Sequence, residues 1–383
     1  MSRRFLPLSL ALLSLALLAW LGPRLLPDYP VRVLTVMAVN VILVCSLGLS
    51  NGFTGVFSLG HVGFAALGAY SSSVLSLSLQ GKASYLPDLP VWLAHLHLAD
   101  LPATLIAGLL CALVALLVGA PLMRLNGNYV SVATLGFLII VNVVLVNADT
   151  YTRGARTFTG IDTSTTLPVA LAWMVLTLTV LSRVAYSAHG RAMRATREDV
   201  VAAQGVGIRI LPTRLSAFVI GAFFAGIGGA LYAHYLGSFS PATFYFGLMV
   251  TQLAMLVVGG QASLTGAATG VLLVTLLSET LRNLERGFSL GALTLPPLYG
   301  VSQVVLGMVF ILVMVYRPQG LLGARELRLV SGPPDIHRAA TDPPQSPAAL
   351  SVPLSSTSPA AGPASRPPVI SPPATQSTRQ EDV

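Results

Sequence analysis

Charged residues at regular spacing are concentrated in one short segment of an otherwise apolar chain. The segment has arginines three residues apart, followed by two acidic residues; these are Arg191, Arg194, Arg197, Glu198 and Asp199. Side chains three positions apart lie on roughly one face of a helix, so the sequence predicts an amphipathic helix from Arg191 to Ala203. Small Ala202 and Ala203 would let a partner approach closely, and Gly205 and Gly207 are expected to end the helix. The chemistry of such a segment is recognition: it either docks on a protein or holds lipid headgroups, and composition favours neither.

Residues suited to catalysis are scattered and form no recognisable group. His95 and His97 alternate in a predicted loop without a carboxylate neighbour, which is a weak indication of a metal site. No glycine-rich phosphate loop occurs, and the one lysine, Lys82, lies in a loop, so the chain is not expected to hydrolyse ATP. No acidic residue lies deep in an apolar segment, as proton coupling requires, and Glu279 near a helix end comes closest. The sequence therefore predicts that the chain is not an enzyme and binds no cofactor or metal. Any transport by the chain must then be passive or powered by a partner.

The composition places the chain in a membrane. Hydrophobic residues make up 54% and charged residues 9%, with a mean hydropathy of +0.76, whereas soluble domains carry roughly 25% charged residues. The net charge of +8 is almost wholly arginine. The positive-inside rule and anionic lipid headgroups explain this charge without a nucleic-acid partner. Cys45 and Cys111 lie in apolar runs, where they are expected to behave as small hydrophobic residues.

Ten segments are apolar and nearly or fully long enough to span a bilayer, which takes about 20 residues. They are 5–22, 31–50, 60–80, 101–123, 129–147, 167–187, 214–236, 243–260, 262–281 and 297–316. The first is predicted to be a retained helix, because no small-x-small cleavage site follows it at Trp20-Leu21-Gly22-Pro23. The eighth and ninth are separated only by Gly259, Gly260 and Gln261, so either is a candidate re-entrant segment. We predict an all-α polytopic integral membrane protein with about ten transmembrane helices.

The placement of arginine sets the expected orientation. With the N-terminus inside, most arginines fall on the cytoplasmic side, together with the charged segment and the C-terminus. From residue 331 the chain is rich in Pro, Ser and Ala without apolar periodicity, which is typical of disorder. The predicted domains are a transmembrane domain, 1–330, with a cytoplasmic loop at about 188–213, and a disordered cytoplasmic tail, 331–383.

A solute path would need polar or irregular backbone groups at membrane depth. Buried amides need partners, and hydrogen bonds between helices explain them as well as a solute does. A glycine-rich stretch from about 46 to 70 could break a helix, and broken helices line solute paths where protein shields the backbone. A histidine in this stretch is interpreted either as a structural hydrogen-bonding group or as a pH-sensitive gate. The candidate path residues are Asn40, Asn51, Gly52, Gly55, His61, Asn142 and Gln252.

Several sequence blocks resemble one family of transport proteins. The run Ala202-Ala203-Gln204-Gly205-Val206-Gly207 resembles the core of the cytoplasmic coupling loop of ABC importer permeases, although Val201 replaces the glutamate that opens the general motif. GRAMRATREDVVAAQGVGI, from Gly190, is more similar to the loop of branched-chain amino acid permeases of the LivM type. The stretch 215–241, SLGH at 58–61 with GFAALGAY after a further residue, VVGG at 257–260 with LTG at 264–266, and YRPQGLLG at 316–323 also resemble that family. These blocks occur in the expected order over most of residues 40–325.

The resemblance implies an ABC importer permease bundle in a bacterial inner membrane. Its implied partners are a second, LivH-like permease subunit, two ABC ATPase subunits and an extracytoplasmic solute-binding protein, besides membrane lipid. In the coupling loop, Arg191, Arg194, Arg197, Glu198 and Asp199 are expected at or near the ATPase contact, Ala202 and Ala203 in close packing, and Gly207 in the turn. The implied function is ATP-driven import of leucine, isoleucine and valine.

Two other functions stay open. The stretch 152–158 departs from the more glycine-rich version of the family, so urea, short amides or other amino acids are alternative solutes, and a ribose-type sugar permease is a more distant one. A protein of a different class, a membrane scaffold whose basic loop binds lipid, would also carry this composition. ATP-dependent uptake distinguishes a transporter from a scaffold.

Overall fold

The structure is a computed structural model that describes residues 21–125, 127–285, 289–290, 293–294, 300–317 and 320–323. These residues belong to one compact unit, Met1–Ser331. The predicted tail, 331–383, and nearly all of the first predicted span, 5–22, lie outside the described residues. The predictions for these two segments therefore stay as they are.

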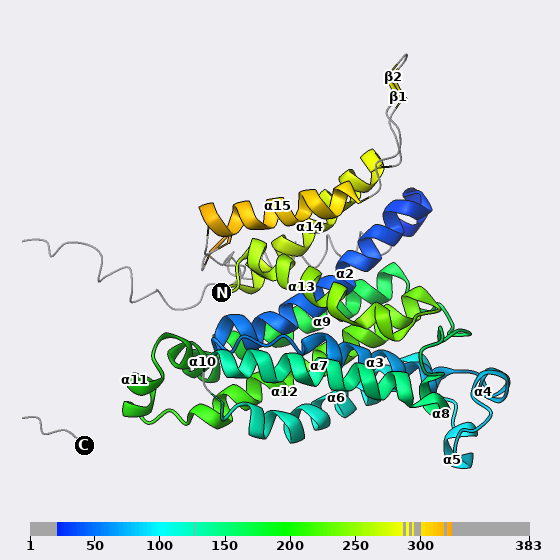
Figure 1. The fold of residues 1–383 in the computed structure, drawn as a ribbon, viewed down its shortest axis with the longest axis horizontal. Coiled ribbons are helices and arrows are strands. Elements are labelled where there is room, and N and C mark those ends of the chain that lie inside the picture. The colour runs from blue at the N-terminus through cyan, green and yellow to red at the C-terminus, as the bar shows by residue number, and fades with distance from the viewer. Residues whose placement is uncertain are drawn as a thin grey trace, which may run out of the picture. The chain divides into compact units, whose positions relative to one another are not determined.

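Helices make up most of the described chain (Figure 1). The first half contains α2 (Asp28–Gly48), the π-helical turn η2 (Leu49–Phe53), α3 (His61–Ser76), α4 (Leu79–Tyr85), α5 (Val91–Ala94), α6 (Asp100–Leu122), α7 (Asn128–Asn147), α8 (Asp149–Thr152) and α9 (Leu167–Tyr186). The second half contains α10 (Ala188–Glu198), α11 (Val200–Gly205), α12 (Ile210–Leu236), the 3-10 turn η3 (Pro241–Phe244), α13 (Phe246–Gly259), α14 (Leu264–Glu285), β1 (Ser289–Leu290), β2 (Leu293–Thr294) and α15 (Val301–Tyr316). The strands are two residues long and pair antiparallel. The predicted all-α class is confirmed.

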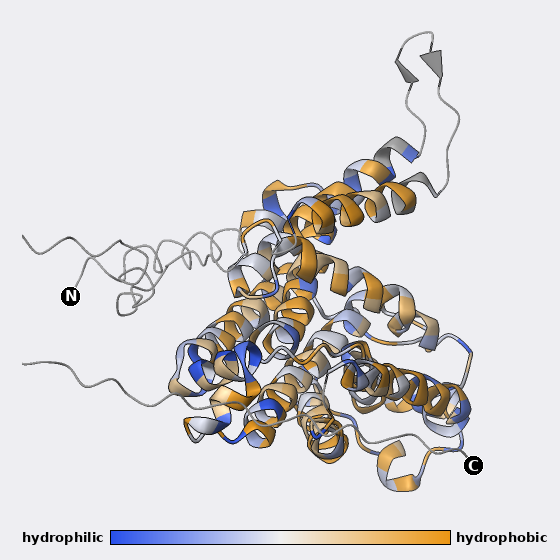
Figure 2. Cartoon of the chain, turned by 60° about the vertical axis from the view of Figure 1, so that its left-hand side comes forward, coloured by the Kyte–Doolittle hydropathy of each residue, from blue (hydrophilic) through white to orange (hydrophobic). Residues whose placement is uncertain are grey.

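Seven helical segments among the described residues are long and apolar enough to cross a membrane. They are Asp28–Phe53, Asp100–Leu122, Asn128–Asn147, Leu167–Tyr186, Ile210–Leu236, Pro241–Gly259 and Leu264–Arg282. The pair α3 and α4, bent by 115°, brings the number to eight if it forms one broken span, and Val304–Tyr316 is a shorter apolar helix. Each of these helices overlaps a predicted segment, while the total of about ten stays a prediction. The long helices are predominantly hydrophobic along their length (Figure 2).

Helix α12 lies at the centre and packs against α2, α3 and α6. Close approach depends on glycines without side chains: a Cβ added at Gly68 of α3 would overlap the backbone of Gly226 in α12. A Cβ at Gly229 would likewise overlap the carbonyl of Ala65. Small residues permit this contact between backbones in membrane helices, where van der Waals packing and interhelical hydrogen bonds drive association.

Connections between the long helices gather at two ends (Figure 1). The α10 end holds η2, α10, α11 and the α13–α14 turn, and η2 contacts both α10 and this turn directly. The α4 end holds α4, α5, α8 and the loop 153–166, which is joined to the segment after α12 by an antiparallel bridge between Phe158 and Phe239.

Candidate functional site

The charged segment forms two short helices rather than the single helix that its spacing predicts. Ser187 caps α10, since its hydroxyl accepts a hydrogen bond from the Gly190 N–H at 3.2 Å. Asp199 then leaves the helical conformation (φ −152°, ψ 117°), and its carboxylate accepts from the N–H groups of Val201 (2.7 Å) and Ala202 (3.0 Å). Aspartate is a preferred N-cap because it satisfies the free N–H groups of a first helical turn. The continuous helix from Arg191 to Ala203 is therefore corrected to α10 and α11, joined at Asp199.

Two of the predicted docking arginines contact their own chain. Arg197 Nη1 donates to the carbonyl oxygen of Gly52 at 2.7 Å. The Arg194 guanidinium lies 5.2 Å from the centre of the Phe53 ring and 5.6 Å from that of Tyr186, within the range of a cation–π interaction. Arginine spacing predicted a shared face, but the structure shows that this face reaches η2.

Exposed apolar side chains at this end lie on α11 and directly after it. Val201 and Val206 are each 77% exposed, and Ala202 between them is also exposed. Ala203 is buried within this chain, and its expected close packing against a partner stays a prediction. Gly207 lies in the loop between α11 and α12 and adopts a positive φ of 84°. Its expected role in the turn of the coupling loop stays a prediction.

We call Val201, Ala202 and Val206 the α11 tip. Sequence reasoning did not single out the two valines. The substitution of Val201 for the family's glutamate was the available signal, because it puts an apolar side chain where a charged one is usual. Arg191 and Glu198 are exposed nearby on α10.

The predicted break in a helix is present and lies directly under α10. The Asn51 amide clamps the segment that follows η2, since its Oδ1 accepts from Ser58 N–H at 2.9 Å and its Nδ2 donates to the Ser58 carbonyl at 3.2 Å. Gly55 has φ 71°, and a Cβ there would lie 3.0 Å from Cγ of Arg197. A Cβ at Gly52 would overlap the carbonyl oxygen of Gln261. The structure thus brings Asn51, Gly52 and Gly55 together at the junction of α2 and α3.

Of the other candidate path residues, His61 lies beside this junction, whereas Asn142 lies far from it. His61 begins α3, is buried, and its Nε2 lies 2.8 Å from the Ser46 hydroxyl. This contact fits the structural interpretation of His61. Asn142, on α7, donates to the carbonyl of Pro241 at 3.3 Å, toward the opposite end of the helices. Asn40 is buried on α2.

Gln252 differs from the other polar candidates. It lies on α13 and is 1% exposed, and among the described residues neither its amide nitrogen nor its amide oxygen has a hydrogen-bond partner. Leaving a buried polar group unsatisfied costs about 1–3 kcal/mol, so such a group in a folded protein calls for a functional or structural explanation. An amide pair can accept from an ammonium group and donate to a carboxylate, the two charged ends of a free amino acid.

The loop at the α4 end is anchored rather than freely solvated. The Phe158 side chain is fully buried in an aromatic cluster with Tyr70 and Phe239, with ring centres 5.9 Å from each. Arg153 lies over the Tyr85 ring at 4.9 Å and donates to the Thr157 carbonyl. The remaining charged residues of this loop, Asp149, Arg156 and Asp162, are exposed.

Lys82 and His234 are buried at the same end and were not predicted to be so. Lys82 lies in α4, and its ammonium group donates to the carbonyls of Leu93 (2.9 Å) and Leu96. His234, in the last turn of α12, contacts the hydroxyl of Ser72 at 3.0 Å. Among the described residues no group of three metal-ligating side chains occurs, His95 and His97 included.

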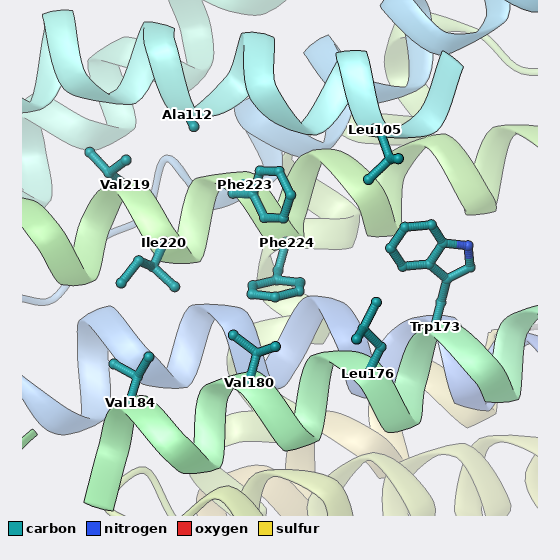
Figure 3. A pocket seen from close by; sticks show the side chains of 10 residues that line it. All are labelled: Leu105, Ala112, Trp173, Leu176, Val180, Val184, Val219, Ile220, Phe223 and Phe224. Carbon is teal, nitrogen blue, oxygen red and sulfur yellow. The ribbon is translucent and has the colours of Figure 1, made fainter. Parts of the chain in front are cut away.

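An apolar groove of about 400 Å³ lies between α6, α9 and α12 (Figure 3). Its lining residues are Leu105, Ala112, Trp173, Leu176, Val180, Val184, Val219, Ile220, Phe223 and Phe224. Charged groups in an apolar environment cost several kcal/mol unless they are paired. This groove is therefore unsuited to the two charged ends of an amino acid.

Long apolar helices that together contain seven or eight candidate spans define a multi-pass membrane protein. A family model described as "Branched-chain amino acid transport system / permease component" matches residues 29–314. The chain belongs to this family. No solved structure matches it.

Relatives of known name agree with this membership. The chain is 31% identical to the high-affinity branched-chain amino acid transport system permease protein LivM of Escherichia coli K12, over 82% of this chain and 74% of the relative. It is 31% identical to LivM of Salmonella typhimurium, over 84% and 77% respectively. It is also 32% identical to the permease protein LivH of Escherichia coli K12, over 44% of this chain and 51% of that one. The predicted LivM-type resemblance is thus confirmed.

Proposed function

We propose that this chain is the membrane-spanning permease subunit of an ATP-driven ABC importer for branched-chain amino acids. Family membership over residues 29–314 carries the proposal. The described helices add a hydrophobic bundle with a charged, two-helix element at one end, where a driving partner could act.

The proposed partners are a LivH-like permease subunit, two ATPase subunits and an extracytoplasmic solute-binding protein. The α11 tip is the proposed ATPase contact, because it presents exposed valines on a short helix held by the Asp199 cap. Arg191 and Glu198 would flank this contact. The exposed charges of Asp149, Arg156 and Asp162 at the α4 end are the proposed surface for the binding protein.

The proposed location is the bacterial inner membrane with the α10 end in the cytoplasm. The support is the positive-inside rule, because the α10 end carries Arg191, Arg194, Arg197 and Arg209. Both termini would then be cytoplasmic. The α4 end would face the binding protein.

The proposed translocation path runs past the α2–α3 junction and Gln252. The junction supplies irregular backbone shielded by α10, and Gln252 supplies unpaired amide atoms. Leucine, isoleucine and valine are the proposed solutes, and selectivity among them is assigned largely to the binding protein.

Purification from the native membrane in mild detergent, followed by mass spectrometry, tests this function. Recovery of ABC ATPase subunits and a second permease with this chain is expected. A monodisperse chain without ATPase subunits would contradict the proposal and favour the scaffold, with the α10 segment as a lipid anchor. Ligand specificity of the co-purified binding protein would distinguish branched-chain amino acids from urea or amides.

A further inference from the structure

The contact between α10 and η2 joins the charged element to the first described span. Helix α2 continues into η2, and the carbonyl of Gly52 belongs to the last turn of this span. Carbonyls in a last helical turn lack partners within the helix and carry the negative end of its dipole. Arg197 supplies the missing donor from α10 at 2.7 Å. A cation at this position is therefore stabilised both by a hydrogen bond and by the dipole.

Two further contacts hold α10 on this turn and on the residues directly after it. The Arg194 guanidinium lies over the Phe53 ring. Gly55 packs against the stem of Arg197, where a Cβ would lie 3.2 Å from the Arg197 Cα and 3.3 Å from its Cβ. Although Arg197 is largely exposed, its stem and its Nη1 are thus both held by η2 and the residues directly after it.

The η2 turn also contacts α13 and α14, at the turn that joins them. Gly52 lies so close to the Gln261 carbonyl that no side chain fits between them, which places η2 directly on the α13–α14 turn. That turn is held in its own right by the segment after α15, since Leu321 N–H donates to the Val258 carbonyl at 2.9 Å and Leu322 N–H to that of Gly259 at 3.2 Å. Backbone segments in direct contact leave little room for one to move without the next.

We propose that Arg197 is a positioning residue that latches α10 to η2, so that movement of α10–α11 is passed to the α2–α3 junction and to the α13–α14 turn. We call this contact the Arg197 latch. The latch rests on the proposed function, because it gives the route by which ATPase closure at the α11 tip reaches the spans. Arg197 itself acts through η2 and does not touch solute.

The test uses the complete importer, with this chain, its partner permease and the ATPases, reconstituted in proteoliposomes with liganded binding protein. Arg197→Ala removes the donor, Arg197→Lys keeps a cationic donor, and Arg183→Ala is the matched control, an exposed arginine at the same end of the helices. Two quantities are measured: leucine taken up per ATP hydrolysed, and hydrogen exchange of the backbone amides in residues 49–56. Exchange reports local opening of the segment.

For Arg197→Ala we expect uptake per ATP to fall about tenfold or more and exchange in residues 49–56 to rise by a similar factor, the size expected from losing one charge-assisted hydrogen bond. Arg197→Lys should restore at least half of the coupling, and Arg183→Ala should match the unchanged chain. Unchanged exchange in Arg197→Ala would overturn the latch. Faster exchange with unchanged uptake per ATP would overturn its role in transmission. If the complex without any substitution takes up no leucine, the proposed function is refuted instead. The exchange measurement would still show whether Arg197 holds residues 49–56.

Discussion

Gln252 and Thr177 present the same physical problem at two places among the spans. Both side chains are buried, and their polar atoms have no partner among the described residues. A buried polar group without a hydrogen bond is destabilising, and replacing it by an apolar group of similar shape can be stabilising. The two residues differ in position, because Gln252 lies on α13, which packs on α2 and α14, whereas Thr177 lies on α9.

We expect Gln252→Leu to raise the thermal midpoint of the purified chain while lowering ATP-driven leucine uptake at least tenfold. Removal of unsatisfied amide atoms should stabilise the folded chain by about 1–3 kcal/mol. Uptake should fall because leucine at position 252 cannot form the hydrogen bonds to the solute that the Gln252 amide would form. Thermal unfolding in detergent and uptake in proteoliposomes measure the two effects. Thr177→Val is the control, expected to stabilise without loss of uptake. Full uptake by Gln252→Leu would remove Gln252 from the path.

Asp199 sets the angle at which α11 leaves α10, because its carboxylate caps the first turn of α11. Replacement of an aspartate N-cap by alanine costs about 0.5–2 kcal/mol, whereas asparagine caps nearly as well. Asp199→Ala should therefore weaken ATPase binding about three- to tenfold, and Asp199→Asn should leave it near its original value. Affinity for detergent-solubilised ATPase measures both. Equal losses in the two variants would show that the charge of Asp199 matters rather than its cap.

At the scale of elements, α11 is the part of the α10 end that offers apolar surface outward. Val201 lies on a helix of only six residues and Val206 directly follows it, and the buried Ala203 anchors this helix to the rest of the chain. Short helices are marginal on their own and depend on packing. Docking on a partner would bury these valines and stabilise the helix.

The double change Val201→Asp and Val206→Asp should abolish co-purification of ATPase subunits while the chain still inserts in the membrane. Two carboxylates buried at an apolar contact would each cost several kcal/mol. Pull-down from detergent extracts measures the loss. Val91→Asp is the matched control, since Val91 is 74% exposed at the α4 end, and it should retain the ATPases. Retention by the double variant would contradict the assignment of the α11 tip.

The long helices could be predicted from the sequence because a span demands about 20 apolar residues in a row. The form of their irregular parts could not. The glycines between 46 and 70 indicated a possible break, but the π-helical turn at Leu49–Phe53 and the contacts of Gly52 and Gly55 that explain the bend are visible only in the structure. In the sequence, Asp199 is one of several charged residues in an amphipathic segment. Its role as the cap of α11 is visible only from its backbone conformation.

The direction of the arginine face was equally hidden in the sequence. A spacing of three places Arg191, Arg194 and Arg197 on roughly one side of a helix, but spacing does not tell whether that side meets a partner or the chain itself. Arg194 and Arg197 reach Phe53 and Gly52, about 145 residues away in the sequence, and a single sequence holds no signal of such a pairing.

At the scale of the whole molecule, the two ends must lie on opposite sides of the membrane. The orientation can be checked with single cysteines, since the two native ones, Cys45 and Cys111, are buried. Trp92→Cys at the α4 end should react with a membrane-impermeant maleimide in intact spheroplasts. Val206→Cys at the α10 end should react only after permeabilisation. The reverse pattern would place the α10 end outside and contradict its role as the ATPase contact.

The most direct test of the whole account is leucine uptake by proteoliposomes that hold this chain with its LivH-like partner and the ATPases. Liganded binding protein is added outside and ATP is enclosed inside. The account predicts uptake against a gradient that requires both ATP and binding protein and stops when ATP is replaced by a non-hydrolysable analogue. Leucine movement that is independent of ATP, or no movement by an intact complex, would contradict it.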